Sequence, residues 1–226
     1  MTDPTADLTL LQYGDSFFPS GAVSFSWGLE TLCAEGRITA APEVSSFLHS
    51  QLRHRWATCD RPAVAAGHRM GEDLDAVAKI DRLLEAQSLA AELRDGSRRS
   101  GGALLAVHEK LGTPGAETYR ALVRSGGAPG HVAVVQGLVG RGAGLVLTAC
   151  EVLSAHTLCV GLLGAALRLG VIGHIDAQRI LKQARVSIAD ILAVPAPGVD
   201  AMSAFTPEAE IAVMRHETAE TRLFAN

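Results

Sequence analysis

Apolar residues recur three and four positions apart along most of this chain, which is the spacing of one face of an α-helix. The clearest case is residues 175–194, where Ile180, Leu181, Ala184 and Ile188 share a face and basic residues lie between them. The helical template predicts helices over residues 8–13, 22–34, 41–56, 60–70, 72–87, both ends of 88–112, much of 131–169, 175–194 and from 206 onward. The pattern therefore predicts an all-α fold, a multi-helix bundle of about ten helices.

Glycine, proline and capping residues set the expected helix ends. Pro19-Ser20-Gly21 should stop one helix and redirect the chain, because proline fixes its φ angle and glycine accepts angles that other residues avoid. Asp60 is expected to cap a new helix. Gly96, Gly101 and Gly102 should interrupt the middle of the helix that contains them, and glycines placed there indicate a close approach, either of a neighbouring helix or of a partner surface, or a kink. Residues 125–130, SGGAPG, predict a short loop.

One run is apolar enough to suggest a membrane. The segment between Glu151 and Arg168, VLSAHTLCVGLLGAAL, has no formal charge. It is shorter than the roughly 20 residues that a span requires, and Ser154, His156 and Thr157 interrupt it. We therefore expect a buried central helix and no membrane span.

Length and composition favour one compact unit. A chain of 226 residues can bury a core without disulfides or metals, and 48% hydrophobic but only 4% aromatic residues suit closely packed helices. We expect a single domain over residues 1–226, with a flexible tail at residues 1–6 and an exposed segment within residues 195–226.

Charge and cysteine content narrow the function classes. A net charge of -4 and a pI near 6.1 give no electrostatic footprint for nucleic acid, and the basic clusters at 53–55 and 98–99 are expected on solvated helix faces. Four cysteines without a CxxC pair indicate neither a disulfide framework nor a zinc site. With no signal peptide at the N-terminus, a cytoplasmic location is expected.

No catalytic motif stands out. Residues 140–144, GRGAG, are too compact for a dinucleotide fingerprint, and His216-Glu217 lacks the second histidine of a zincin site. His156 and Cys159 lie one helical turn apart, but two ligands do not make a metal site, and packing is the commoner role of such a pair. An enzyme is disfavoured, and we expect no catalytic residue, metal site or cofactor.

A series of motifs resembles the UreF family of urease accessory proteins. In chain order they are LLQ at 10–12, DS at 15–16, PSG at 19–21, SWGLE at 26–30, RRSG at 98–101, AALRL at 165–169, QRIL at 178–181, HE at 216–217 and RLF at 222–224. The resemblance covers essentially the whole chain. It implies an all-α protein that forms a homodimer and has a non-catalytic role in loading nickel into urease.

The resemblance also implies partners. Family members bind a second accessory protein, UreD or UreH, and the complex recruits the nickel-carrying GTPase UreG before docking on apo-urease. The motifs carry partner binding to Pro19, Ser20, Gly21, Ser26, Gly28, Glu30, Arg168, Arg222, Leu223 and Phe224. Glu30 and Arg168 match positions implicated in contact with the GTPase. Arg222-Leu223-Phe224 matches a tail that helps to bind the UreD-type protein together with the preceding segment VPAPGVDAMSAF, so the resemblance implies a partner-binding C-terminal segment over residues 195–226.

The opening motif suggests how Glu30 is presented. In the helix expected over residues 22–34, Phe25, Leu29 and Cys33 are spaced four apart and predict a packed face, which leaves Glu30 on another face. The turn before this helix would then direct Glu30 toward a partner.

Alternatives stay open at this point. A small helical enzyme would show a pocket lined by titratable groups with perturbed pKa values. A nickel-binding chaperone would use His156, Cys159 or His216. For Arg168 the choices are a gating contact, an arginine finger that stabilises phosphoryl-transfer charge, and a cap for helix carbonyls near Gly170.

Overall fold

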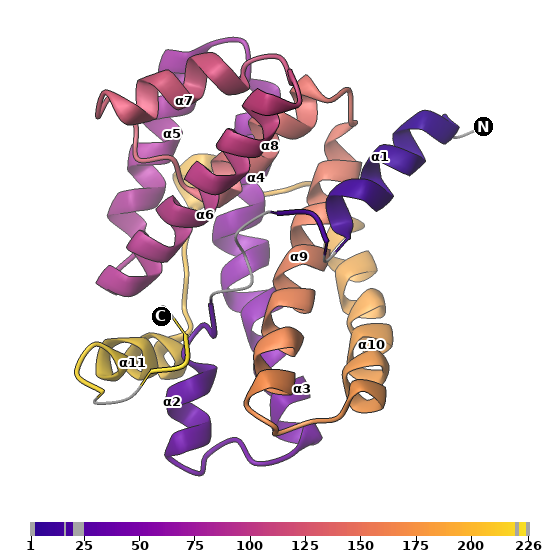
Figure 1. Ribbon diagram of the computed structural model, residues 1–226, viewed down its shortest axis with the longest axis vertical. Coiled ribbons are helices and arrows are strands. Elements are labelled where there is room, and N and C mark those ends of the chain that lie inside the picture. Colours follow the sequence, from indigo (N-terminus) through magenta and orange to yellow (C-terminus); the bar gives the residue numbers. More distant parts are fainter. Residues whose placement is uncertain (1–2, 16, 20–24, 220–221, 225–226) are drawn as a thin grey trace.

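The computed structural model describes residues 3–15, 17–19, 25–219 and 222–224, and over these residues it is helical with no strand (Figure 1). The α-helices are α1 (Pro4–Gly14), α2 (Leu29–Ala34), α3 (Ala41–Gln51), α4 (Arg61–Arg69), α5 (Leu74–Gln87), α6 (Ala91–Lys110), α7 (Ala116–Arg124), α8 (Val132–Gly142), α9 (Leu147–Arg168), α10 (His174–Leu192) and α11 (Pro207–His216). A π-helical segment, η2 (Leu52–Asp60), joins α3 to α4, and a 3-10 turn, η3 (Val199–Ala201), precedes α11. The predicted all-α bundle is confirmed.

Two large hydrophobic clusters form most of the interior of the described residues, a small third cluster consists of Ala90, Leu93 and Val213, and two long helical rods pass through both large clusters. The first rod is the unbroken run α3–η2–α4, in which Leu48 and Leu52 pack in one cluster and Ala63 and Val64 pack in the other. The second rod is α9, whose two ends likewise belong to different clusters. α8 packs along α4, α6 and α7 cover α8, and α10 flanks α3 and α9 (Figure 1).

The apolar helix α9 lies inside the bundle. By length and composition alone it is long and apolar enough to cross a membrane, but 56% of its most apolar window is buried within the protein. It packs against α1, α2, α3, α4, α8 and α10. These contacts are those of the buried central helix that the sequence predicts.

The first helix begins earlier than expected. Pro4 is its first residue, and the Asp3 carboxylate accepts a hydrogen bond from the backbone N–H of Thr5 at 3.0 Å. An aspartate cap followed by proline favours a helix start, so residues 4–6 belong to α1 and not to a flexible tail, while residues 1–2 lie outside the described residues. α1 has no buried residue and projects from the bundle (Figure 1).

The helix predicted from residue 22 begins only at Leu29. Trp27 and Gly28 have φ angles of 58° and 85°, and two successive left-handed residues cannot continue a right-handed helix. Residues 22–24 lie outside the described residues. The segment directly before α2 is thus a turn, and the predicted helix face of Phe25, Leu29 and Cys33 does not form, because Phe25 lies outside the helix.

Helix α6 runs without a break through its glycines, contrary to prediction. A Cβ at Gly96 would overlap the Phe25 ring, and a Cβ at Gly101 would overlap the carbonyl of Gly130. The glycines therefore give room to neighbouring groups and do not end the helix. Phe25 packs on α6 and does not share a helix face with Leu29.

The prediction that Asp60 caps a new helix is also wrong. Asp60 has helical φ and ψ angles, makes no capping hydrogen bond, and lies within the continuous rod, 3.7 Å from Arg55 Nε. Burial raises the pKa of Asp60, although the charge of Arg55 opposes this shift. Arg55 itself is 4% exposed, with its guanidinium 5.1 Å from the centre of the Trp27 ring, so it does not lie on a solvated face.

The loop over residues 125–130 lies where the sequence predicts it and is anchored by a buried carboxylate. Asp81 of α5 accepts hydrogen bonds from the Tyr119 hydroxyl at 2.7 Å and from the backbone N–H groups of Gly130 and His131. This carboxylate joins α5, α7 and the start of α8.

After α10 the chain follows the π-helical segment. The backbone N–H of Ser203 donates to the Thr58 carbonyl at 3.0 Å, and that of Phe205 donates to the His54 carbonyl at 2.9 Å. Phe205 is 76% exposed as expected, whereas Met202 is buried. The chain then enters α11, which lies beside α2 (Figure 1).

Candidate functional site

Helices α2 and α11 pack so closely that position 28 has room only for glycine. A Cβ on Gly28 would lie 2.7 Å from the Ala209 carbonyl oxygen and 3.1 Å from the Ala212 Cβ. This contact sets Glu30, in the first turn of α2, beside His216, the last residue of α11.

The Glu30 carboxylate holds the end of the chain. Its Oε1 accepts the backbone N–H of Leu223 at 2.7 Å, and its Oε2 accepts that of Phe224 at 3.1 Å. The Ser26 hydroxyl lies 3.4 Å from the backbone N of Glu30 and caps the start of α2. A carboxylate that accepts two backbone N–H groups fixes the course of both residues.

His216 connects this carboxylate to a second one. The imidazole is 2% exposed; its Nε2 lies 3.1 Å from Glu30 Oε2 and its Nδ1 lies 2.8 Å from Glu92 Oε2. Glu92 belongs to the first turn of α6. One buried ring thus joins α2, α6 and α11.

Arg222 completes the network. Its NH1 donates to Glu92 Oε1 at 3.0 Å and its NH2 donates to the Glu217 carbonyl at 2.9 Å. Two carboxylates and one histidine therefore form a network with the C-terminal segment 222–224, to which Arg222 itself belongs.

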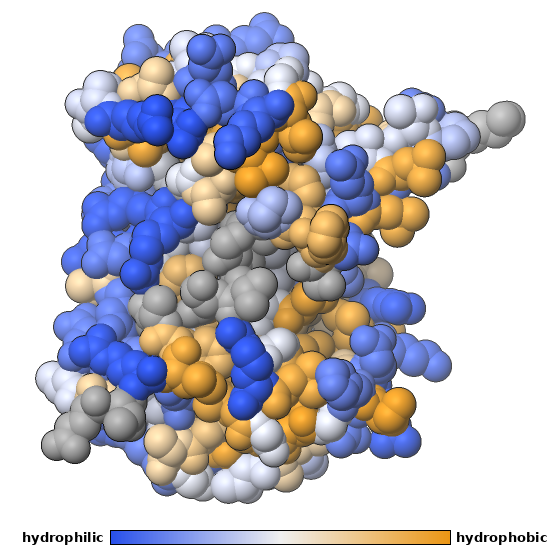
Figure 2. Space-filling view, in the orientation of Figure 1, coloured by the Kyte–Doolittle hydropathy of each residue, from blue (hydrophilic) through white to orange (hydrophobic). Residues whose placement is uncertain are grey.

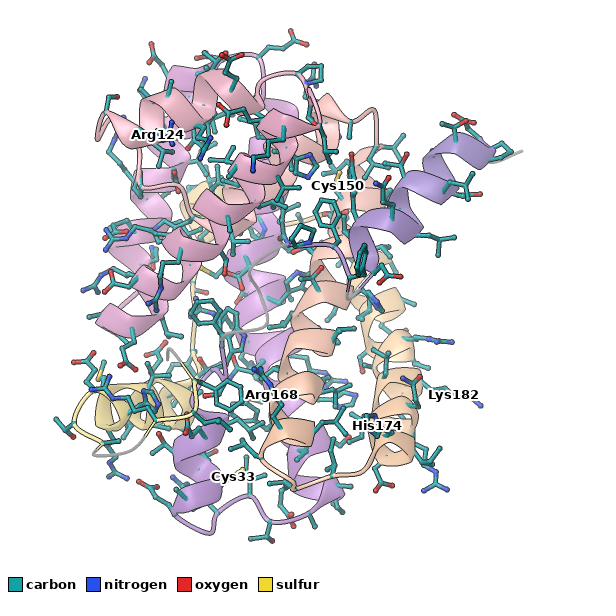
Figure 3. The ribbon with its side chains drawn as sticks, in the orientation of Figure 1. Cys33, Arg124, Cys150, Arg168, His174 and Lys182 are labelled. Carbon is teal, nitrogen blue, oxygen red and sulfur yellow. The ribbon has the colours of Figure 1, made fainter. Side chains whose placement is uncertain are left out.

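Arg168 contacts the same segment from α9. Its guanidinium carbon lies 4.2 Å from the centre of the Phe224 ring, within the range of a cation–π interaction, and its Nε donates to the Gly164 carbonyl at 3.3 Å. Phe224 is buried, while Leu223 is 61% exposed. Arg168 lies near the end of α9 that faces α2 and the C-terminal segment (Figure 3).

A shallow groove adjoins this network. It measures about 670 Å³ and runs between α2, the loop after α9 and the end of α11, with Glu30, Cys33, Leu169, Val171 and His216 among its lining residues. Apolar surface gathers on the lower half of the face in Figure 2, over α2 and the ends of α9 and α10. The groove and the exposed Leu223 side chain offer contact area to another protein.

Comparison with known proteins identifies the family. A model of the UreF family matches residues 38–185. The urease accessory protein UreF of Trichodesmium erythraeum (strain IMS101) is 37% identical over 100% of this chain and 99% of its own length. The corresponding protein of Paenarthrobacter aurescens (strain TC1) is 34% identical over 97% of this chain and 98% of its own, and that of Yersinia enterocolitica serotype O:8 is 28% identical over 97% of each.

The chain belongs to the UreF family. Membership makes it a urease accessory protein and implies a role in urease maturation. The resemblance of the UreF motifs to this sequence is thereby confirmed.

The structure brings most of the UreF motif positions together. Seven of them form the C-terminal segment, contact it or support α2: Ser26, Gly28, Glu30, Arg168, Arg222, Leu223 and Phe224. Pro19 is exposed and follows Phe18, which packs in the other hydrophobic cluster. Ser20 and Gly21 lie outside the described residues. The Glu30 carboxylate faces the chain's own C-terminal residues, not outward as the helix face over residues 22–34 predicts.

Two residues of the UreF network escaped the sequence analysis. Glu92 resembles any acidic residue in the first turn of a helix, and the sequence places His216 in a UreF motif and among candidate metal ligands without indicating its contact with two carboxylates. His216 meets Glu92 across a separation of 124 residues and Glu30 across 186, and such long-range pairs leave no local pattern.

The candidate nickel ligands of the UreF chain are dispersed. Among the described residues no three histidine, cysteine or acidic side chains form a metal-binding group. Cys159 is fully buried, and burial raises the pKa of its thiol to about 12; burial lowers the pKa of His156. Both ring nitrogens of His216 face carboxylates.

Proposed function

We propose that this protein is a non-catalytic scaffold of urease maturation. In this proposal it acts in the cytoplasm as a homodimer, binds a UreD/UreH-type accessory protein, and recruits and regulates a UreG-type nickel-carrying GTPase, so that nickel reaches apo-urease. Membership of the UreF family supports a role in urease maturation. The arrangement of residues 222–224 against Glu30 and Arg168 is the observation that supports the partner-binding role.

The C-terminal segment suits a partner of the UreD type. It is held by side chains from three helices, yet it exposes Leu223 beside a groove of about 670 Å³. A segment already fixed in place loses little conformational entropy on binding, which favours affinity. An exposed leucine next to charged groups matches the apolar core and polar rim of protein interfaces.

The contact of Arg168 favours gating over direct catalysis in the GTPase. Its guanidinium is occupied by the Phe224 ring and the Gly164 carbonyl, so reaching a nucleotide bound to another protein would require leaving both. A GTPase that docks beside α9 would instead sense whether the C-terminal segment is in place. In this arrangement Arg168 and Glu30 act through the position of the segment.

Co-purification tests the proposal. The full-length protein is combined with both accessory partners, with and without GTP and nickel. We expect a stable complex with the UreD-type protein and recruitment of the GTPase to it. Arg222→Ala, or deletion of residues 222–226, should weaken capture of the UreD-type protein without loss of helical content by circular dichroism.

A matched control is Arg179→Ala, which removes an exposed arginine of α10 that pairs only locally with Asp176. Unchanged capture after deletion of residues 222–226, or equal loss with Arg179→Ala, would overturn the role of the segment. Calorimetry of the isolated protein with Ni²⁺ separates the alternatives, since tight stoichiometric binding would favour a nickel-binding chaperone.

A further inference from the structure

The imidazole of His216 sits between two carboxylates, where a neutral ring forms both hydrogen bonds only if one of the carboxylates carries a proton. Its two nitrogens lie 3.1 Å from Glu30 and 2.8 Å from Glu92. A neutral imidazole donates from one nitrogen and presents a lone pair on the other, whereas the imidazolium donates from both. With a neutral ring, one lone pair would face a carboxylate oxygen in a nearly dry site.

The charged and titratable groups around this ring come from α2, α6, α9, α11 and the residues after it. Glu30 of α2 and Glu92 of α6 contact the ring, and Cys33, Glu35 and Arg215 line the same groove. Arg168 of α9 contacts Phe224, and Glu217 and Arg222 follow α11. Arg215 is paired with Glu35, and burial together with the nearby Glu30 raises the pKa of the Cys33 thiol to about 11, so that it stays neutral. The two carboxylates are therefore balanced by Arg222 and protonated His216.

We propose that His216 is a proton-dependent latch for the C-terminal segment. When the ring is protonated, Glu30 and Glu92 are both held inward, Glu30 accepts the N–H groups of Leu223 and Phe224, and Glu92 accepts Arg222. When the ring loses its proton, one carboxylate must turn away from it. Either choice removes an anchor of the segment, and Leu223 and Phe224 are released.

The direction of the pH effect follows from proton linkage. The docked segment requires a proton on His216, so docking weakens as the pH rises. The groove beside Glu30 and His216 gives the proton a path to solvent.

Hydrogen exchange of the Leu223 and Phe224 amides tests the latch in the full-length protein. Protection factors, corrected for intrinsic exchange, are measured by NMR between pH 6 and 8.5. We expect wild-type protection to fall with rising pH by up to roughly tenfold per pH unit, the limit for coupling to one proton. His216→Gln, which cannot change charge, should show low protection without this pH dependence.

The matched control is His174→Gln, which removes an exposed histidine of α10 and should keep the wild-type profile. A flat wild-type profile, or the same slope in His216→Gln, would refute the latch. Should His216→Gln fail to fold, the ring nitrogens are observed directly by ¹⁵N NMR of the wild type. A neutral His216 at pH 6 with the segment still protected also refutes it.

The role of the latch in partner capture rests on the proposed function, but this experiment uses no partner. Loss of UreD-type binding with an intact exchange profile would count against the proposed function alone. A flat profile with intact partner binding would count against the latch alone.

Discussion

Replacing Gly28 with alanine tests how closely α2 is packed against α11. The backbone of Gly28 is left-handed, with a φ angle of 85°. A Cβ at this position would also lie 2.7 Å from the Ala209 carbonyl oxygen, closer than real Cβ contacts allow. Because the obstructing atom belongs to the backbone, it can move only if α11 moves.

Two terms add up to the expected cost. A side-chain-bearing residue in the left-handed region costs roughly 1–2 kcal/mol. Forcing an extra carbon into a packed contact costs about 1–3 kcal/mol. Gly28→Ala should therefore lower the free energy of unfolding by about 2–5 kcal/mol.

Gly36→Ala separates the two terms. Gly36 has a φ angle of 70°, but a Cβ there meets no atom within 4 Å, so only the first term applies. Thermal unfolding by circular dichroism measures both variants. The extra 1–3 kcal/mol corresponds to a Tm lower by about 2–12 °C for a chain of this size. If the two variants unfold at the same temperature, the close packing of α2 on α11 is refuted.

Three further variants test other parts of the structure. Burial lowers the pKa of His108 from 6.5 to about 4. Because the unfolded chain then takes up a proton at a higher pH than the folded chain, the free energy of unfolding falls by about 3 kcal/mol as the pH falls from 6.5 to about 4. Urea unfolding of His108→Gln should depend less on pH across that window. Asp81→Asn should cost about 2–4 kcal/mol in urea unfolding, because an amide cannot accept from Tyr119 and both backbone groups. Arg168→Gln should speed exchange of the Phe224 amide about two- to fivefold through loss of roughly 0.5–1 kcal/mol of cation–π energy.

For each of these three variants, one result would contradict the prediction. An unchanged pH dependence in His108→Gln would show that the ring is not kept neutral by burial. Asp75→Asn, at an exposed position of the same helix as Asp81, should cost less than about 0.5 kcal/mol, and equal costs would contradict the anchoring role. For Arg168, exchange that stays at the wild-type rate would mean that the ring contact does not hold Phe224.

The local spacing of apolar residues predicted most of the helices. It failed where groups far away in the sequence determine the local structure. The run over residues 175–194 matches α10 because its apolar face repeats along a single element. Helix α6 continues through its glycines: Phe25 packs against Gly96, the loop at Gly130 packs against Gly101, and a Cβ at Gly102 would meet no atom within 4 Å. No local signal tells an interrupting glycine from one that admits a neighbour.

The site was predictable only in part. The motifs point to Glu30, Arg168 and the terminal residues, and the structure brings them together. The direction of the Glu30 side chain was not predictable, because the left-handed residues Trp27 and Gly28 form a turn directly before Leu29, where a helix was expected. The role of His216 in the network depends on its distances from the carboxylates of Glu30 and Glu92, which only the folded chain defines.

The π-helical segment η2 has a consequence for how the sequence can vary. Each residue of a π-helix turns the chain by somewhat less than the roughly 100° of an α-helix, so removing one residue from Leu52–Asp60 would rotate α4 relative to α3 by a large part of that angle. Ala63 and Val64 would then leave their cluster while Leu48 stayed in its own. Substitutions at the exposed positions of η2, Arg53 and His54, are compatible with the fold, but a one-residue insertion or deletion would put the two halves of the bundle out of phase. The length of this segment is therefore expected to vary less among relatives than its composition.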